Sequence, residues 1–157
     1  MNTNTKHLLA VMLAVACVAA MLAGCGQAQA PDAGFAQMGN PLVEVASADE
    51  MEQKLGYSVP VMDKEVAAYI VLVIDGKADM GRIRYADGSV FNIKKGSGDI
   101  SGIYGGTLEQ EQAIGGVTVS FYSLEGQSYA IWEDGGFAYS LSDCPTLQED
   151  VAELIGK

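Results

Sequence analysis

Histidine is nearly absent from this chain of 157 residues, because its single copy, His7, lies in an N-terminal apolar segment. A mature protein that has lost this segment contains no imidazole. Ser-His-Asp and Cys-His catalysis need an imidazole, and the usual zinc sites use histidine or several cysteines. We therefore expect a non-enzymatic protein without a cofactor and without a metal ion.

Cysteine is also scarce. Cys17 belongs to the N-terminal apolar segment, and the sulfur of Cys25 is expected to carry a lipid for the reasons given below, which leaves Cys144 as the only free thiol. One thiol cannot form an intramolecular disulfide, although an exported protein meets conditions that permit one. No histidine or cluster of cations surrounds Cys144 in the sequence to activate it. We expect an unreactive thiol and a monomeric protein.

Basic residues are outnumbered by acidic ones. The chain has nine Lys and Arg against twenty Asp and Glu, a net charge of −11. Loss of residues 1–24 removes Lys6 and no acid, so the mature charge becomes −12. A domain this acidic repels the phosphates of nucleic acids and the headgroups of anionic lipids. We expect no nucleic-acid partner.

Residues 1–24 are typical of a lipoprotein signal peptide. Lys6 precedes an uncharged apolar run, 8–23, that is shorter than the roughly 20 residues of a comfortable membrane span. The run ends in Leu22-Ala23-Gly24-Cys25, which resembles the bacterial lipoprotein box. This resemblance implies cleavage before Cys25 and a diacylglyceryl group on its sulfur, with further acylation, such as palmitate, on the new amino group. The alternative is an ordinary cleaved signal peptide in which Cys25 has no role.

The expected location is therefore extracytoplasmic, at the bacterial cell membrane. Two or more acyl chains on Cys25 anchor a protein stably, so the membrane itself is a predicted partner. Residues 25–39 are rich in Ala, Gln and Gly without periodicity, which is typical of a flexible tether. A single domain is expected over 40–157.

The stretch 116–142 predicts a three-stranded antiparallel meander. Its short apolar runs are separated by Glu125-Gly126 and Asp134-Gly135-Gly136, and such pairs favour two-residue turns with positive φ. Apolar and polar side chains alternate along the runs with the period of a strand. Trp132, the only tryptophan, falls in the middle strand.

A second meander is predicted over 67–95. Its strands, 67–74, 77–86 and 89–95, are separated by Asp75-Gly76 and Asp87-Gly88, both type I′ signals. The glycine-rich segment 96–115 between the meanders is interpreted as a connector, and its length suggests a role or some local structure.

Two capping boxes predict two helices. Ser47 and Thr146 each precede a glutamate by three residues, so each hydroxyl can accept a hydrogen bond from the first turn of a helix. Apolar residues at helical spacing follow, and a glycine ends each pattern. The expected fold class is α+β: an antiparallel sheet of about six strands in two meanders, flanked by an N-terminal helix (48–55) and a C-terminal helix (147–155).

A succession of short motifs characterises the domain. They are, in order, Asn40-Pro41, Leu55-Gly56-Tyr57, Pro60, Arg84-Tyr85, Asp87-Gly88, Asp99-Ile100-Ser101-Gly102, Ala130-Ile131-Trp132 and Tyr139-Ser140-Leu141. This succession resembles a bacterial family catalogued as domain of unknown function 4367, over residues 40–155. The resemblance implies an extracytoplasmic domain, often in a lipoprotein or attached to a membrane-bound regulator of the anti-sigma type. It implies no catalytic residues.

Five residues are candidates for a binding site: Asp99, Ser101, Tyr104, Trp132 and Tyr139. Asp99 and Ser101 can form a polar recognition loop, or they can shape a turn through hydrogen bonds to the backbone. The aromatic residues can line a ligand surface, or they can belong to the core.

The strand 67–74 is apolar on both faces. Two short helices can cover one side of the sheet, so curvature, the connector 96–115 or a partner has to shield part of the other side. The leading hypothesis is a binding or sensing module for an unknown protein or a small apolar ligand. The alternative is a carrier of a lipid or other apolar ligand on a curved sheet. A third hypothesis assigns carboxylates to glycoside hydrolysis or to a calcium site, the alternative being solvent-exposed acids without a role; these are Glu109, Glu111, Glu133, Asp134 and Asp143.

Overall fold

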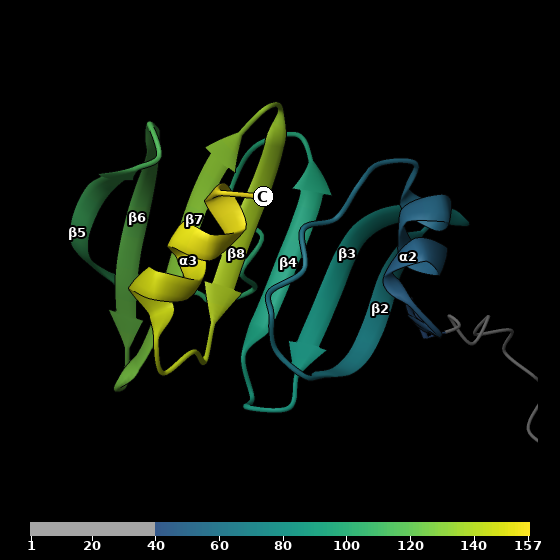
Figure 1. Ribbon diagram of the computed structural model, residues 1–157, viewed down its shortest axis with the longest axis horizontal. Helices are drawn as coiled ribbons and strands as arrows, with labels where there is room; N and C mark the ends of the chain where they lie inside the picture. Colours follow the sequence, from purple (N-terminus) through teal and green to yellow (C-terminus); the bar gives the residue numbers. More distant parts are fainter. Residues whose placement is uncertain (1–39) are drawn as a thin grey trace, which may run out of the picture. The chain divides into compact units, whose positions relative to one another are not determined.

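The described part of the chain is one α+β unit. The computed structural model describes residues 40–157, so the predicted signal peptide (1–24), the lipidated Cys25 and the tether (25–39) lie outside the described residues. Residues 40–157 form eight antiparallel strands in one sheet and two helices (Figure 1). The predicted antiparallel sheet with two helices is confirmed, whereas the predicted number of six strands is wrong.

The sheet consists of two meanders joined side by side. Its order is β1-β2-β3-β4-β8-β7-β6-β5, and every neighbouring pair is antiparallel. Pairing of β4 with β8 joins the first meander to the second. The strands are β1 (Leu42–Val45), β2 (Val66–Ile74), β3 (Lys77–Tyr85), β4 (Val90–Lys95), β5 (Thr107–Ile114), β6 (Val117–Leu124), β7 (Gln127–Asp134) and β8 (Phe137–Ser142).

The two strands missing from the sequence prediction are the edges, β1 and β5. β1 has only four residues. β5 lies inside the segment 96–115 that the glycine pattern assigns to a connector, and all its residues except Ile114 are exposed. A strand exposed on both faces needs no alternation of apolar and polar side chains, so its pattern carries no signal. Its register is given by pairing with β6.

The turns follow the predicted chemistry with one exception. Asp75 and Gly76 have φ of 50° and 74°, and Glu125 and Gly126 have 51° and 87°. These are the left-handed values of a type I′ turn. Asp87 does not have a positive φ, so the type I′ prediction is wrong there. The β3–β4 hairpin instead has a longer loop, residues 86–89, in which Gly88 has φ of 95°.

Both helices pack on the same face of the sheet. α2 (Ala48–Leu55) contacts β2 and β3, and α3 (Leu147–Ile155) contacts β7 and β8 (Figure 1). The Ser47 hydroxyl accepts a hydrogen bond from the Glu50 amide at 3.2 Å, which confirms the first capping hydroxyl. Thr146 does not cap α3, because its hydroxyl donates to the Asp150 carboxylate at 2.8 Å.

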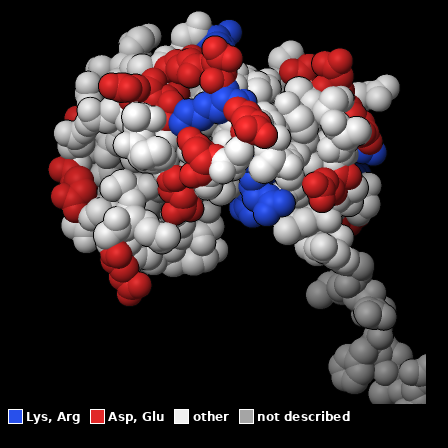
Figure 2. Space-filling model, turned by 60° about the horizontal axis from the view of Figure 1, so that its bottom comes forward, with Lys and Arg blue, Asp and Glu red and all other residues white. Residues whose placement is uncertain are grey.

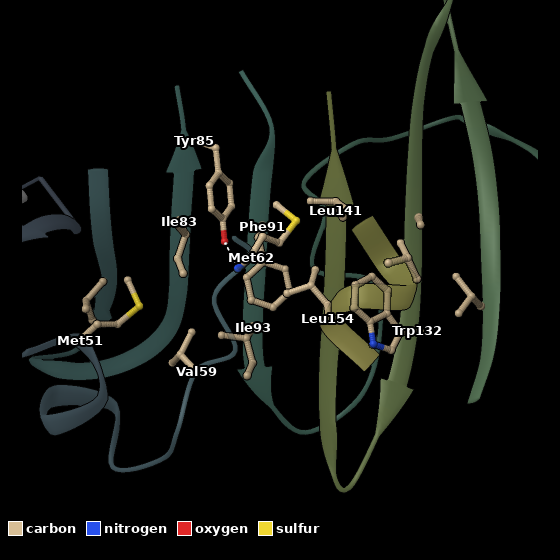
Figure 3. Packing of buried hydrophobic residues seen from close by; sticks show 14 of the residues in the cluster. Met51, Val59, Met62, Ile83, Tyr85, Phe91, Ile93, Trp132, Leu141 and Leu154 are labelled. Atoms are coloured by element: carbon tan, nitrogen blue, oxygen red, sulfur yellow. Dashed lines mark hydrogen bonds between the residues drawn. The ribbon is translucent and has the colours of Figure 1, made fainter. Parts of the chain in front are cut away.

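The core lies between the helices and this face of the sheet, which we call the helix face. Phe91 and Ile93 point into it from β4 and are almost completely buried, as the strand pattern predicts. Figure 3 shows Met51 of α2 at one end of the cluster, and Leu154 of α3 next to Trp132 towards the other end. The two helices thus share one continuous core.

The segment 56–65 fills the gap between the helices. Val59 and Met62 are buried in the cluster, and the Met62 amide donates to the Tyr85 hydroxyl at 3.1 Å (Figure 3). Gly56 ends α2 with φ of 78°, and its amide donates to the Glu52 carbonyl. The helix face is therefore covered by α2, this segment and α3.

The opposite face of the sheet, which we call the open face, carries no helix of the described residues. The connector between β4 and β5 crosses it behind β7 and β8 in Figure 1, where the Gly98 amide donates to the Glu133 carboxylate at 2.7 Å. Strand alternation places Leu72 on this face and Val71 on the helix face. Leu72 is half-buried, whereas Val71 is fully buried. On β1, β2 and β3 this face carries exposed Leu42 and Ile74 beside buried Ile70 and Met80.

None of the helices within 40–157 has the length and apolar character of a membrane span.

Candidate functional site

A cleft on the helix face brings together two of the five predicted residues, Trp132 and Tyr139. It has a volume of about 340 Å³. Val59 and Pro60 of the segment 56–65 line one wall, and Leu154 and Ile155 of α3 line the other. Trp132 and Tyr139 come from the β7–β8 hairpin and form the floor (the cleft is hereafter the aromatic cleft).

The register of the hairpin positions the floor. Trp132 and Tyr139 are directly opposed on β7 and β8, with ring centroids 5.3 Å apart and ring planes within 6° of parallel. Phe91 stacks against both rings, at 6.3 and 6.2 Å. Cross-strand aromatic pairs of this kind stabilise a sheet and hold each ring in place. Trp132 is only 5% exposed, so a ligand in the cleft would contact part of the indole and not its whole face.

Of the two charged side chains that line the cleft, one has an ion-pair partner among the described residues and the other has none. Lys157 is paired with Glu153 at 2.8 Å. Asp134, at the end of β7, is exposed and takes part in no ion pair among residues 40–157. Burial and then the charge of Asp134 raise the pKa of Tyr139, so its hydroxyl stays protonated and able to donate. The lining of the cleft is therefore mixed: apolar side chains from its floor and walls stand beside Asp134 and Lys157, which carry opposite charges.

The other three predicted residues lie elsewhere, on the connector between β4 and β5. The Asp99 carboxylate accepts from the Ser101 amide at 2.8 Å, and the Ser101 hydroxyl accepts from the Ile103 amide at 3.0 Å. These are turn-forming bonds of a side chain with the backbone two residues on. Tyr104 is 89% exposed. Asp99 and Ser101 therefore shape the connector, and the structure does not bring them to the aromatic cleft.

Other hollows of similar size lie in the described part of the chain, and two of them contain acidic residues considered above. One, of about 480 Å³, is under the connector; its lining includes two of the predicted residues, Asp99 and Trp132, and also Asp134. The second, of about 460 Å³, lies between the start of α3 and the edge strands β5 and β6, and includes Glu109 and Glu149. Neither contains a floor of stacked aromatic rings, so the aromatic cleft is the better candidate for an apolar ligand.

The carboxylates considered for hydrolysis are spread over the sheet. Glu109 and Glu111 on β5 accept from the hydroxyls of Ser123 and Ser120. Glu133 on β7 accepts from the Gly98 amide. Each of these three acids thus has a local partner. Among residues 40–157, no group of three or more His, Cys, Asp or Glu side chains is arranged to hold a metal ion. On the face shown in Figure 2, acidic side chains lie in separate small groups.

A charged cluster that the sequence does not reveal lies where three distant segments meet. Lys64 Nζ is 2.6 Å from an Asp150 oxygen and 2.9 Å from an Asp87 oxygen. Burial opposes the charge of Lys64, but its hydrogen bonds with Asp150 and Asp87 outweigh this and raise its pKa. Lys64 is therefore a permanent cation and cannot serve as a general base.

Cys144 belongs to the same cluster. Its thiol donates to Asp150, and Lys64 Nζ is 3.7 Å from its sulfur. Burial, and then the hydrogen bond with Asp150, raise the pKa of Cys144. A raised pKa leaves little thiolate at neutral pH, and the thiolate is the reactive form. The cluster is structural: it ties α3 to the β3–β4 hairpin and to the segment before β2.

Comparison of the chain with protein-family models, with curated proteins and with solved structures finds no match. The resemblance to domain of unknown function 4367 stays a prediction. Function therefore has to be proposed from the cleft and the surface themselves.

Proposed function

We propose that this protein is a membrane-tethered, extracytoplasmic binding or sensing module, without catalytic activity, that takes a small ligand into the aromatic cleft. The observation that carries the proposal is a cleft of about 340 Å³ whose walls are aliphatic and whose floor is the Trp132–Tyr139 stack. Small-molecule sites are typically concave and mostly apolar, with a few polar groups that orient the ligand.

The polar groups indicate the class of ligand. Asp134 offers an unpaired carboxylate at the rim, and the protonated Tyr139 hydroxyl offers a donor. A carboxylate of this kind favours a positively charged or hydrogen-bond-donating group. The proposed ligand is therefore small and largely apolar, with an amine or a similar donor at one end.

Carriage of a lipid on the open face is less well supported. The middle of that face carries a polar ladder, in which Arg82 Nε donates to the Asn92 side chain at 2.8 Å and Asn92 donates to the Ser140 hydroxyl at 2.9 Å. A lipid chain lying across the sheet would remove the exposed part of Arg82 from water without offering it a partner, which is costly. The aromatic cleft has no such penalty.

Ligand binding can be followed through Trp132, because it is the only tryptophan of the chain. We expect saturable changes in its fluorescence with small aromatic or branched aliphatic amines, and none with the corresponding carboxylic acids. Asp134→Asn removes the charge that attracts the amine, and is expected to weaken binding about threefold to fivefold, the loss of an exposed ion pair. Titrations of wild type and variant measure this directly.

Asp75→Asn is the matched control, since it removes the same charge from an exposed position in the β2–β3 turn that lines neither the cleft nor the hollow under the connector. It should leave the affinity within about twofold. The proposed site is wrong if amines and acids act alike, or if the two variants weaken binding equally. Native mass spectrometry of the protein from its own cells would then identify any ligand that remains bound elsewhere.

The tether is tested separately. Cys25→Ser is expected to move the protein from the membrane fraction to the soluble fraction, because acyl chains on that sulfur and its amino group are the predicted anchor. The measurement is the distribution of the protein after a salt wash, together with the mass of the N-terminal peptide of the wild type. A variant that stays in the membrane, with a wild-type peptide of unmodified mass, would exclude the lipoprotein assignment.

A further inference from the structure

The two arginines of the chain lie side by side on the open face. Arg82 and Arg84 are the only arginines in the sequence. Both alternate with buried residues of β3, namely Ile83 and Tyr85, which point into the core. The arginine side chains therefore point to the opposite face, with backbone positions about 7 Å apart.

Neither arginine has an acidic partner within the described part of the chain. Lys54, Lys64, Lys94 and Lys157 each form an ion pair there. Lys77 and Lys95 also form no ion pair there, but each lies at the end of a strand, whereas Arg82 and Arg84 lie within β3. The nearest acid across the rows of the sheet is Glu44 on β1, two strands from Arg82 and so about 10 Å away.

Arg82 is held in a fixed orientation. Its Nε donates to the Asn92 amide oxygen at 2.8 Å, and Asn92, almost completely buried, donates in turn to Ser140. This ladder runs across β3, β4 and β8 and leaves the two terminal nitrogens of the guanidinium without a partner in the ladder. Such a fork matches the two oxygens of a carboxylate.

Exposed aliphatic side chains continue the surface on the neighbouring strands. Leu42 is 39% exposed and Ile74 is 49% exposed, and half-buried Leu72 pairs with Leu42 across β1 and β2. Alternation along β2 places Leu72 and Ile74 on the same face, and Leu42 shares it through its pairing with Leu72. An aliphatic area bordered by unpaired arginines has the composition of a protein interface, in which arginine is enriched.

We propose that Leu42, Leu72, Ile74, Arg82 and Arg84 form a docking surface for a segment of a partner protein in which acidic residues flank aliphatic ones. Charge complementarity selects this occupant. A second copy of the domain would bring its own large negative charge, and an anionic membrane would face the whole acidic domain. A short acidic segment on the arginines is exposed mainly to the local positive charge, because salt screens more distant charges beyond about 8–10 Å. This surface is separate from the aromatic cleft.

The test selects ligands from a phage library of random twelve-residue peptides, with the full-length chain in neutral detergent as the bait. We expect the selected peptides to contain at least two Asp or Glu next to Leu, Ile or Val. Fluorescence anisotropy then measures their affinity for variants. Arg84→Glu and Leu72→Asn should each weaken binding at least tenfold.

Lys95→Glu is the matched control, because it changes the charge by the same amount at an exposed, unpaired lysine on the edge of the helix face. It should change the affinity less than twofold. Three results would overturn the proposal: no acidic consensus, equal losses for Arg84→Glu and Lys95→Glu, or losses only for the cleft variant Asp134→Asn. Two further measurements test the other possible occupants. Sedimentation with phosphatidylglycerol vesicles tests binding to a membrane, and analytical ultracentrifugation tests binding to a second copy of the domain. Arg84-dependent binding to vesicles, or Arg84-dependent dimerisation, would replace the peptide with a membrane or with a second copy.

Discussion

Val71→Asn is expected to lower the free energy of unfolding of residues 40–157 by roughly 3–5 kcal/mol, whereas Leu72→Asn should lower it by about 1 kcal/mol. Val71 is fully buried on the helix face, in the core cluster below α2. An amide buried there without a partner costs roughly 1–3 kcal/mol, and loss of the buried valine adds about 1.5–3 kcal/mol. Leu72 is half-buried on the open face, where an amide still reaches water. Urea midpoints of the two variants measure the difference.

The comparison is informative because the two residues are neighbours in one strand. Total stabilities of small domains are about 5–15 kcal/mol, so the loss in Val71→Asn is large enough to shift the midpoint clearly. Equal and large losses would mean that the face with Leu72 is covered in solution. Such a result would also remove the aliphatic part of the proposed docking surface. A small loss in Val71→Asn would contradict the packing of α2 on β2.

The middle of the sheet could be predicted because burial on one face imposes a period of two. Residues such as Phe91, Val119 and Leu141 alternate with polar or small ones and are fully buried. The edges could not be predicted for the same reason. β5 is exposed on both faces, so nothing in its sequence distinguishes its two sides.

The helix caps also show that a local sequence pattern does not always predict the local structure. Ser47 and Thr146 both stand three residues before a glutamate, and only Ser47 accepts from a backbone amide. The Thr146 hydroxyl donates instead to Asp150, which already accepts hydrogen bonds from Lys64 and Cys144. The need to satisfy a buried carboxylate outweighs the local capping preference, and Lys64 is far from Thr146 in sequence.

The candidate site could be predicted in part. Trp132 and Tyr139 are opposed because a two-residue turn joins their strands, which the sequence indicates. The walls of the cleft come from Val59 and from Leu154, and only the tertiary packing of the segment 56–65 against α3 brings them there. The position of the arginines relative to Leu42 is likewise hidden, because it requires the pairing of β1 with β2.

Lys64→Met is expected to destabilise the domain by about 2–3 kcal/mol at pH 7. Removal of one partner of a buried ion pair costs about 3–5 kcal/mol, and the partial exposure of Lys64 reduces this. The main cause is Asp150, which is buried and would keep its charge without its cation. Lys54→Met is the matched control: it breaks the exposed pair of Lys54 with Glu50, at 3.7 Å, and should cost less than about 0.5 kcal/mol.

The dependence on pH separates the lost charge from the lost packing. Burial would raise the pKa of Asp87, but hydrogen bonds from Lys64 and Ser89 lower it to about 2. Burial likewise opposes the charge of Asp150, and its hydrogen bonds from Cys144, Lys64 and Thr146 lower its pKa. A lowered pKa in the folded state stabilises fully above the unfolded pKa near 4, and this stabilisation is lost as the pH falls toward 2. The difference between wild type and Lys64→Met should therefore be largest at neutral pH and shrink between pH 4 and 2. Urea midpoints at pH 7 and pH 3 measure it. A difference that stays constant would mean that Lys64 acts through the packing of its aliphatic stem, and that its charge does not hold α3 against the β3–β4 hairpin.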